Sequence, residues 1–301
     1  MEGILPIWKP AGLTSHDVVA RVRRLLRIKR VGHAGTLDPM VTGVLPIAIG
    51  RAARAIEYIQ EMPKSYEAVL RFGIATDTED LTGNVIERAE RISLSREQVE
   101  AALQPFRGKI KQIPPMYSSV KKDGKRLYEL ARQGITVERE AREVEIYKLD
   151  LIAFSPSHEA PEARLTVTCS KGTYIRTLCK DIGAALGVPS VMARLVRTAS
   201  GPFTGEDCIT LEEAEQLFSA QALEEKIVPV DQAVQHFPAV TLPEQAEKKA
   251  LNGSKLDSPV PPPSTNGKTA YVRVYLPSGR FIGIYAHDPD HQQLVPHKLF
   301  I

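Results

Sequence analysis

Apolar and polar positions recur with two different periods along the chain, which predicts a mixture of strands and helices. Residues 4–8 form a short apolar run and predict a strand. Ser15 then suits the N-cap of a helix whose buried stripe contains Val18, Val19, Val22, Leu25 and Leu26. In residues 65–72 the period is two, and the apolar face carries Tyr66, Ala68, Leu70 and Phe72.

The same alternation of patterns continues over the rest of the chain. Helical patterns occupy residues 52–59, 95–103, 125–132, 173–186 and 211–218. Extended patterns occupy residues 118–122, 144–154, 163–169 and 191–197. This mixture predicts an α+β fold with a mixed, largely antiparallel sheet.

A change of composition between Asp231 and Leu242 predicts a domain boundary. We assign residues 1–235 to a first domain and residues 236–301 to a small β-rich second one. Within the second, the patterns predict a helix, a proline-rich loop and two strands, at 243–251, 257–268, 271–275 and 281–285. A unit of this size is only marginally stable alone.

Composition places the protein in a broad class. The chain has 301 residues, 43% hydrophobic and 25% charged, which is typical of a soluble globular protein of about two domains. No run approaches the roughly 18 apolar residues of a membrane span, and the N-terminus does not form a signal peptide. The cysteines show no CxxC spacing, which supports neither a disulfide framework nor a cysteine zinc site. We therefore expect a cytoplasmic protein.

The charge is distributed unevenly, although the net charge is only +3. Residues 21–30 include six basic residues and no acid, and residues 107–132 include eight basic residues and two acids. Residues 205–231 instead hold eight acids and one lysine. Each run alone is typical of a solvated helix face. Two basic stretches that are separate from an acidic one also suggest binding of a polyanion such as nucleic acid.

Residues 32–46 are unusually rich in residues with special backbone geometry. They include three glycines, two prolines and two threonines, which predicts a loop of tight turns. The one acid is Asp38, and the proline after it favours an extended backbone there. Asp38 is either a turn residue bonded to its own backbone or a positioned reactive acid, and the residues alone leave both open. His33 has the same two interpretations.

Arg176 is unusual for its place in the predicted helix 173–186. With Thr173 as N-cap, Arg176 occupies N3, where Glu or Gln completes a capping box. A cation there opposes the helix dipole by about 0.3–1 kcal/mol. A buried carboxylate partner would compensate for this cost, whereas an exposed Arg176 with its head group in water needs no partner.

Six segments occur in an order that resembles a known family. They are 9–15 (KPAGLTS), 32–46 with its GTLDP core, 64–66 (KSY), 112–121 (QIPPMYSSVK), 172–178 (GTYIRTL) and 194–198 (RLVRT). Together they closely resemble the TruB-type tRNA pseudouridine synthases, which convert uridine 55 in the TψC loop to pseudouridine. Each motif alone is weak, but six in order are specific. The departures at Met40, Val41, Ser119 and Val196 leave the catalytic positions unchanged.

The resemblance implies roles for particular residues. Asp38 would be the essential carboxylate, acting either as a nucleophile on the sugar or as a base toward a glycal. Arg176 would be its ion partner, and Tyr66 would stack on the target base and take part in C5 deprotonation. His33 would fill the place of the flipped-out base. The remaining substrate-binding residues implied by the resemblance are Tyr174, Leu195, Lys9, Gly35 and Thr36.

The resemblance also implies partners and a fold. Because the reaction is an isomerisation, no cofactor or metal is expected, and the chain lacks P-loop, dinucleotide and His/Cys metal motifs. The expected partner is tRNA, recognised by the shape of its T-arm, with the basic stretches on its phosphates. A pseudouridine synthase fold, a PUA-like second domain, a monomeric state and independence from guide RNA are also implied.

Two other functions are open at this stage. An RNA-binding or RNA-folding protein would keep the basic helices and His33 but would not need Asp38 and Arg176 together. A guide-RNA-dependent relative that modifies ribosomal RNA would share the catalytic motifs but carry a larger C-terminal domain and extra tails. We favour the stand-alone enzyme, since this sequence shows neither addition.

Overall fold

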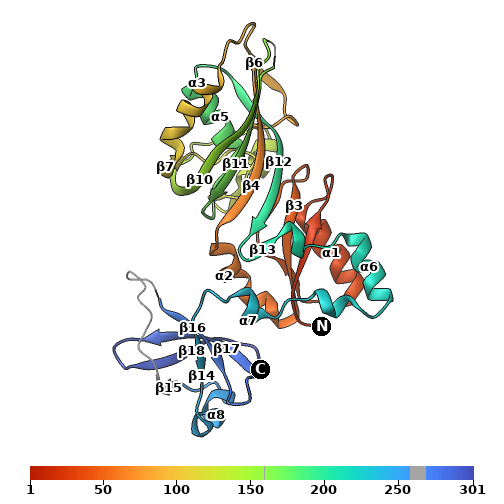
Figure 1. Cartoon of the computed structure of the whole chain (residues 1–301), viewed down its shortest axis with the longest axis vertical. Helices are drawn as coiled ribbons and strands as arrows, with labels where there is room; N and C mark the ends of the chain where they lie inside the picture. Colours follow the sequence, from red (N-terminus) through yellow and green to blue (C-terminus); the bar gives the residue numbers. More distant parts are fainter. Residues whose placement is uncertain (159, 258–268) are drawn as a thin grey trace.

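The computed structural model describes residues 1–158, 160–257 and 269–301. In these ranges the chain forms a large sheet flanked by helices and a smaller sheet at the other end of an elongated molecule (Figure 1). The large sheet has nine strands and the small one has five. Strands and helices are therefore mixed as the sequence predicts.

The large sheet is mixed, and antiparallel pairing dominates it. Its main path runs through β1 (Gly3–Lys9), β3 (Thr42–Ile49), β12 (Ser190–Ser200), β4 (Lys64–Phe72), β11 (Glu162–Cys169), β10 (Arg142–Ser155) and β7 (Gly108–Gln112). Two short strands attach to it, β2 (Val31–His33) beside β3 and β13 (Phe203–Thr204) beside β12. Among the described strands of this sheet, β3 and β12 form the one parallel pair. The predicted α+β fold with a mixed, largely antiparallel sheet is confirmed.

Helices and short hairpins connect these strands. The α-helices are α1 (Ser15–Leu26), α2 (Ile56–Glu61), α3 (Arg96–Leu103), α4 (Leu127–Arg132), α5 (Ile175–Ala185), α6 (Leu211–Ser219), α7 (Val230–Ala233) and α8 (Glu244–Leu251). The 3-10 turns are η1 (Gly50–Ala55), η2 (Gln104–Phe106), η3 (Gly205–Asp207) and η4 (Leu223–Lys226). The hairpins pair β5 (Ile74–Thr76) with β6 (Val85–Arg88) and β8 (Lys121–Lys122) with β9 (Lys125–Arg126). Within the described ranges, no helix combines the length and apolar character needed to cross a membrane.

Several predicted elements are shorter than expected. The helix predicted at 52–59 is divided between η1 and α2, and the strand predicted at 118–122 is reduced to β8. The loop predicted at 32–46 is also shorter, because β2 and β3 occupy its ends and leave only residues 34–41, here called the Asp38 loop. The sequence analysis did not predict β3, because proline is unusual inside a strand and Pro46 lies within this one. In β3, Pro46 is paired with Pro6 of β1. The Pro46 carbonyl accepts a hydrogen bond from the Ala34 amide at 2.9 Å.

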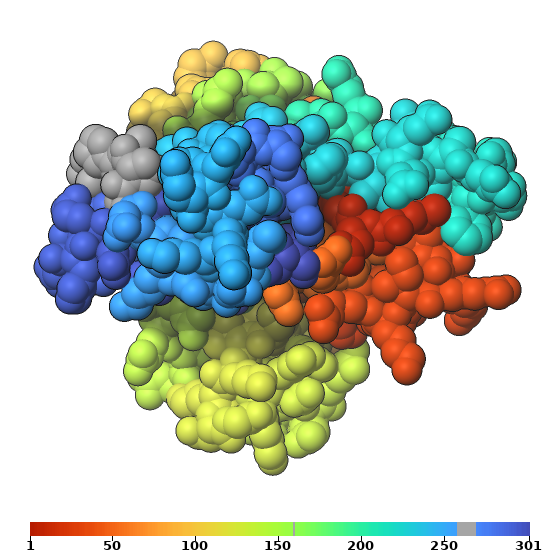
Figure 2. Space-filling model, turned by 90° about the horizontal axis from the view of Figure 1, so that it is seen from below, coloured from red at the N-terminus to blue at the C-terminus, as the bar shows by residue number. Residues whose placement is uncertain are grey.

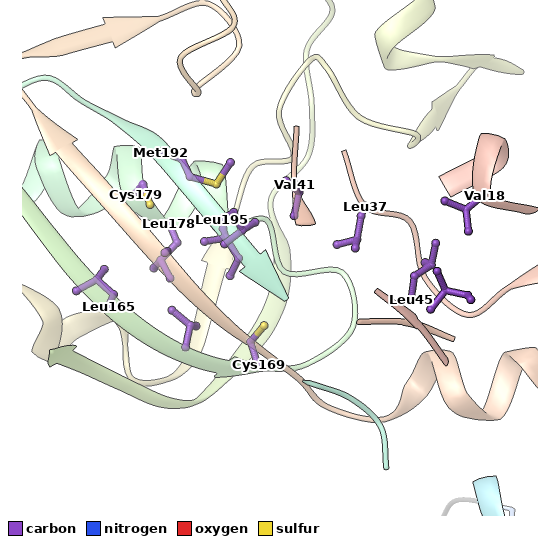
Figure 3. Close-up of a cluster of buried hydrophobic side chains, with 14 of the residues drawn as sticks. Val18, Leu37, Val41, Leu45, Leu165, Cys169, Leu178, Cys179, Met192 and Leu195 are labelled. Carbon is purple, nitrogen blue, oxygen red and sulfur yellow. The ribbon is translucent and has the colours of Figure 1, made fainter. Parts of the chain in front are cut away.

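One hydrophobic core runs from α1 through the large sheet to α5. Figure 3 shows Val18 and Leu45 on one side of Leu37, and Val41 and Leu195 on the other. Leu37 is only 4% exposed, and burying a leucine side chain contributes about 1.5–3 kcal/mol. The residue directly before Asp38 is thus anchored in the core.

The small sheet forms a β-rich C-terminal module, as the sequence predicts. Its strand order is β14 (Ala239–Thr241), β16 (Tyr271–Tyr275), β17 (Phe281–Asp288), β18 (Gln293–Leu299) and β15 (Leu256–Asp257). A separate cluster of buried residues, including Val240, Val272 and Tyr285, fills its interior. Apart from Asp257, the loop predicted at 257–268 lies outside the described residues.

This module packs against the segment around α2 (Figure 2). The Arg54 guanidinium donates to the Leu299 carbonyl at 2.7 Å, and Lys298 forms an ion pair with Glu57 at 2.8 Å. The Tyr58 ring meets the Tyr271 ring edge-on, with 5.3 Å between centroids. The marginal stability expected of so small a unit is offset by this docking.

Candidate active site

The Asp38 loop is held by a buried lysine of β1. Lys9 Nζ donates to the carbonyls of Pro10, Leu13 and Pro39 at 2.8, 2.6 and 3.0 Å. Burial lowers the pKa of Lys9 to about 8, while the negative charge of Asp38 acts in the opposite direction. Since all three ammonium donors are used inside the protein, Lys9 fixes the backbone beside Asp38, and direct binding of substrate would require one of these bonds to break.

The start of α1 holds the same loop from another side. Ser15 Oγ accepts a hydrogen bond from the Leu37 amide at 2.8 Å and lies 3.2 Å from the Leu37 carbonyl, to which it donates. The predicted N-cap role of Ser15 is therefore wrong. Thr14 is the N-cap, and its hydroxyl accepts from the Asp17 amide at 3.0 Å. The hydroxyl of Ser15 is free to bind the loop because its neighbour caps the helix.

Asp38 and Arg176 form the ion pair that the resemblance implies. Asp38 Oδ2 lies 3.1 Å from Arg176 Nε, and the side chains are 43% and 6% exposed, respectively. The guanidinium also donates to the carbonyls of Thr78 at 3.0 Å and Tyr117 at 2.8 Å. A buried, fixed cation thus orients a carboxylate that remains accessible from outside.

Gln112 of β7 fixes the start of α5 and with it the position of Arg176. Its side-chain amide donates to the Tyr174 carbonyl at 3.2 Å and accepts from the Tyr174 amide at 3.0 Å. Tyr174, not the predicted Thr173, is therefore the N-cap, and Arg176 lies at N2 rather than N3. The Thr173 hydroxyl is engaged elsewhere, since it donates to the Ser170 carbonyl at 2.9 Å.

A second carboxylate, which the sequence analysis missed, lies near Arg176. Asp80 Oδ2 is 3.9 Å from Arg176 Nη1, and its other oxygen accepts from the Thr78 hydroxyl at 2.8 Å and the Thr82 amide at 2.9 Å. Burial raises the pKa of Asp38, the charge of Arg176 lowers it, and the charge of Asp80 raises it again, for a net increase. The available sequence signal was the Thr-x-Asp-x-Thr spacing, which is typical of a side-chain-bonded turn.

Tyr66 lies on β4 at the same site. It is partly buried against the core, and in the sheet register it is opposite Arg197 of β12, a residue that the sequence analysis did not select. Burial raises the pKa of Tyr66, the charge of Arg197 and a hydrogen bond from it lower that pKa, and the charge of Asp38 raises it. Tyr66, Arg197 and Asp38 therefore form one electrostatic group.

His33 ends β2 directly before the Asp38 loop. Its ring meets the His16 ring edge-on, with 5.8 Å between centroids, and its Nδ1 has no hydrogen-bond partner among the described residues. Burial, followed by the charges of His16 and Arg197, lowers the pKa of His33. The neutral ring therefore predominates near pH 7.

The other predicted binding residues lie in or beside the Asp38 loop. Gly35 and Thr36 belong to the loop, and their carbonyls accept hydrogen bonds from Arg197. Leu195 of β12 is 8% exposed and packs in the core that also contains Leu37. The structure thus gathers residues from distant parts of the sequence around one carboxylate.

Both basic stretches present cations to solvent. On and after α1, the exposed residues are Arg21, Arg23, Arg24, Arg27, Lys29 and Arg30. In the second stretch they are Lys109, Lys111, Lys121, Lys122, Lys125, Arg126 and Arg132. Such side chains are available to phosphate groups.

Two solved structures share this architecture. A chain in the crystal structure of a Cbf5-Nop10-Gar1 complex superposes with a TM-score of 0.75 and 25% identity, covering 99% of this chain and 85% of that chain. A chain of an H/ACA RNP bound to a substrate RNA containing 2'-deoxyuridine superposes with a TM-score of 0.73 and 22% identity, with the same coverage. The similarity to the H/ACA RNP chain, at 22% identity, concerns the fold alone.

Family models and curated relatives agree with the fold. The TruB family pseudouridylate synthase N-terminal domain matches residues 23–175, and the tRNA pseudouridylate synthase B C-terminal domain matches residues 176–235. The tRNA pseudouridine synthase B of Bacillus licheniformis is 44% identical over 306 residues, covering 100% of this chain and 98% of the relative. That of Bacillus subtilis is 43% identical over 305 residues with the same coverage. Fold and sequence together define an RNA-modifying isomerase of the pseudouridine synthase class. The chain belongs to the TruB family of pseudouridylate synthases.

Proposed function

We propose that this enzyme converts uridine 55 of tRNA to pseudouridine, with Asp38 as the essential carboxylate. The observation that carries the proposal is the 3.1 Å ion pair between Asp38 and Arg176. It lies in a chain that is 44% identical to a tRNA pseudouridine synthase B over its whole length. A protein that only binds RNA gains nothing from an accessible carboxylate, because that charge repels phosphates.

The proposed reaction breaks the C1′–N1 bond and forms a C1′–C5 bond within one nucleotide. Substrate and product are isomers, so the reaction consumes no redox equivalent. Asp38 acts either as a nucleophile at the sugar or as a base toward a glycal, and both routes use the ionised carboxylate. Arg176 favours that form and holds the carboxylate in one orientation through its fixed guanidinium.

The other residues of the site bind and expose the base. Tyr66 stacks on the uracil and takes part in removing the C5 proton, and His33 fills the place of the flipped-out nucleotide. The lowered pKa of His33 supports an uncharged ring for that role. The other proposed substrate-binding residues are Tyr174, Leu195, Gly35, Thr36 and Lys9, of which Lys9 acts by holding the backbone of the Asp38 loop.

The proposed partner is the T-arm of tRNA, recognised by its shape. The exposed cations of α1 and of residues 107–132 bind its phosphates. In this proposal residues 1–235 form the catalytic domain, and residues 236–301 form a PUA-like domain that binds the acceptor side. The enzyme acts as a cytoplasmic monomer without guide RNA. Similarity over the full chain to bacterial proteins named tRNA pseudouridine synthase B supports this choice.

The test uses the purified full chain and an unmodified tRNA transcript, with pseudouridine mapped at single-nucleotide resolution. We expect one product at position 55, both in the tRNA and in an isolated T-arm hairpin, and none in a transcript that carries cytidine there. Product at another position would contradict the assigned site. Activity only after addition of a guide RNA would contradict the stand-alone enzyme, and binding without product would favour an RNA-binding protein.

A further inference from the structure

Arg197 is a buried cation at the centre of the large sheet. Its side chain is among the largest that are fully buried, and the residue is only 1% exposed. In the sheet register it lies opposite Tyr66 of β4 on one side and Gly43 of β3 on the other. Opposite residues on antiparallel strands have Cβ atoms about 4.5–5.5 Å apart, so Arg197 and Tyr66 are direct neighbours.

The guanidinium of Arg197 binds the backbone at the start of the Asp38 loop and in β3 just after the loop. At the first end it donates to the carbonyls of Gly35 at 3.1 Å and Thr36 at 3.5 Å. Just beyond the second end, its Nε donates to the Val44 carbonyl at 2.7 Å. One rigid side chain therefore sets the width of the loop that carries Asp38.

This arrangement is built into the surrounding backbone. Gly35 has a φ of +130°, and a Cβ added there would lie 3.4 Å from Arg197 Nη1. A Cβ at Gly43 would lie 2.2 Å from the carbonyl oxygen of Arg197, closer than any side chain tolerates. The two glycines allow the loop and β3 to approach β12 closely enough for the guanidinium to reach three carbonyls.

The charge of Arg197 has no carboxylate partner within ion-pair distance in the described ranges. A buried charge is costly unless polar groups compensate it, and here carbonyl oxygens and the Tyr66 hydroxyl do so. Arg176, in contrast, pairs with two carboxylates. The unpaired positive charge acts on several neighbouring titratable groups, and Tyr66 is the one directly across the sheet.

We propose that Arg197 is a positioning residue that couples Tyr66 to the Asp38 loop, so that the base and the sugar react in one fixed geometry. This inference rests on the proposed function. In this inference Arg197 affects the last step of the reaction, removal of the C5 proton, whereas Arg176 acts on the carboxylate of Asp38.

In that last step the new C1′–C5 bond is already formed. The C5–H bond breaks, its electron pair becomes the C5–C6 π bond, and the π pair of the C6=N1 double bond moves to N1. The phenolate form of Tyr66 accepts the C5 proton. N1 takes a proton from water, and the resulting hydroxide removes the proton from Tyr66, so that Tyr66 and water return to their starting states. Burial, with smaller contributions from Cys169 and Asp38, raises the pKa of Tyr66 overall, and Arg197 is the group that opposes this rise. Loss of Arg197 is therefore expected to slow this proton transfer most.

The test measures single-turnover rates with tRNA carrying hydrogen or deuterium at C5 of the target uridine. For Arg197→Lys we expect a rate lower by about tenfold or more, corresponding to about 1.4 kcal/mol per tenfold. We also expect a larger deuterium isotope effect, with tRNA affinity within about threefold, roughly 0.65 kcal/mol. In a Tyr66→Phe background the same substitution should have little further effect, because coupled residues are not additive. Arg164→Lys, an exposed change on β11, is the matched control.

The proposal would be overturned in favour of a purely structural role by two results together. The Arg197→Lys variant would be slower with an unchanged isotope effect, and its decrease in rate would add to that caused by Tyr66→Phe. If this variant does not fold, Gly35→Ala provides the second test, since a side chain at a φ of +130° strains the end of the loop whose carbonyl binds Arg197, without removing the guanidinium. Wild-type rate and isotope effect in Gly35→Ala would equally overturn the proposal. An inactive wild-type chain would refute the proposed function instead, so the two failures are distinguishable.

Discussion

Buried and exposed cations of this chain have opposite surroundings. Lys9, Arg176 and Arg197 are buried, and their donors are bound to carbonyl or carboxylate groups of the protein. Arg27 and Arg30, at the end of α1 and beyond it, are exposed instead. The buried set converges on the Asp38 loop, so its function is to fix geometry, whereas the exposed set is available to a polyanion. Composition alone does not distinguish lysines and arginines that fix the geometry of the loop from those that are available to bind a polyanion.

The energetic consequences also differ. Exposed ion pairs contribute only about 0–1 kcal/mol and are screened by salt. Removing one partner of a buried pair leaves an uncompensated charge and costs about 3–5 kcal/mol. Changes in the buried set are therefore expected to alter the chemical step, and changes in the exposed set to alter affinity and its salt dependence.

The largest effect is expected for Asp38→Asn. An amide is neither a nucleophile nor a base for this reaction, so pseudouridine formation is abolished, while tRNA binding stays within a few-fold. Product formation and filter binding measured on the same preparation check both parts. Turnover close to that of the wild type would remove Asp38 from the chemistry, and lost binding would assign it a structural role.

Arg176→Lys is expected to have the next largest effect. Lysine keeps the charge but loses the planar donor geometry that bonds Asp38, Thr78 and Tyr117 together. The single-turnover rate at saturating enzyme should fall at least tenfold, about 1.4 kcal/mol, with little change in tRNA affinity. Equal rates would show that charge alone matters at this position.

Neutralising two of Arg23, Arg27 and Arg30 should change the affinity for tRNA and its salt dependence, but not the chemical step. Each lost phosphate contact flattens the log–log dependence of affinity on salt by about 0.7 for single strands, so the slope should change by roughly 0.7–1.4. The single-turnover rate at saturation should stay unchanged. An unaltered slope would mean that this face is only solvated.

The smallest effect is expected for Asp80→Asn and appears in the pH profile. The charge of Asp80 raises the pKa of Asp38, so its removal lowers that pKa. Because the reaction uses the ionised carboxylate, the rate falls as pH drops through this pKa, and the acidic limb should move to lower pH in the variant. Asp150→Asn, on the surface of β10, is the control. A limb that moves to higher pH would contradict this account.

Local sequence patterns predicted the parts of the fold and site that depend on local geometry. Alternation located β4 with Tyr66, and the unusual cation at the start of α5 left a carboxylate partner for Arg176 as one of two alternatives. Motif resemblance, rather than periodicity, selected Asp38 as that partner. The strand prediction succeeded because the period of a strand is set by neighbouring residues.

Predictions failed where a distant contact decides between local alternatives. Thr14 and Ser15 are both suitable caps, and the bond from Ser15 to Leu37 decides which of them caps α1. Arg197 looks like any strand residue until β3 and β4 are placed on either side of it. Pairing across a sheet is not encoded by spacing along the chain.

The link between Arg197 and Gly35 also has a consequence for synthesis, because the two residues are 162 positions apart in the sequence. A ribosome that adds about 5–20 residues per second needs roughly 8–30 s to cover that interval. During this time the nascent chain already contains Asp38, but the strand that closes its loop has not been made. Competence for the reaction therefore arises only after β12 has been made and has inserted between β3 and β4.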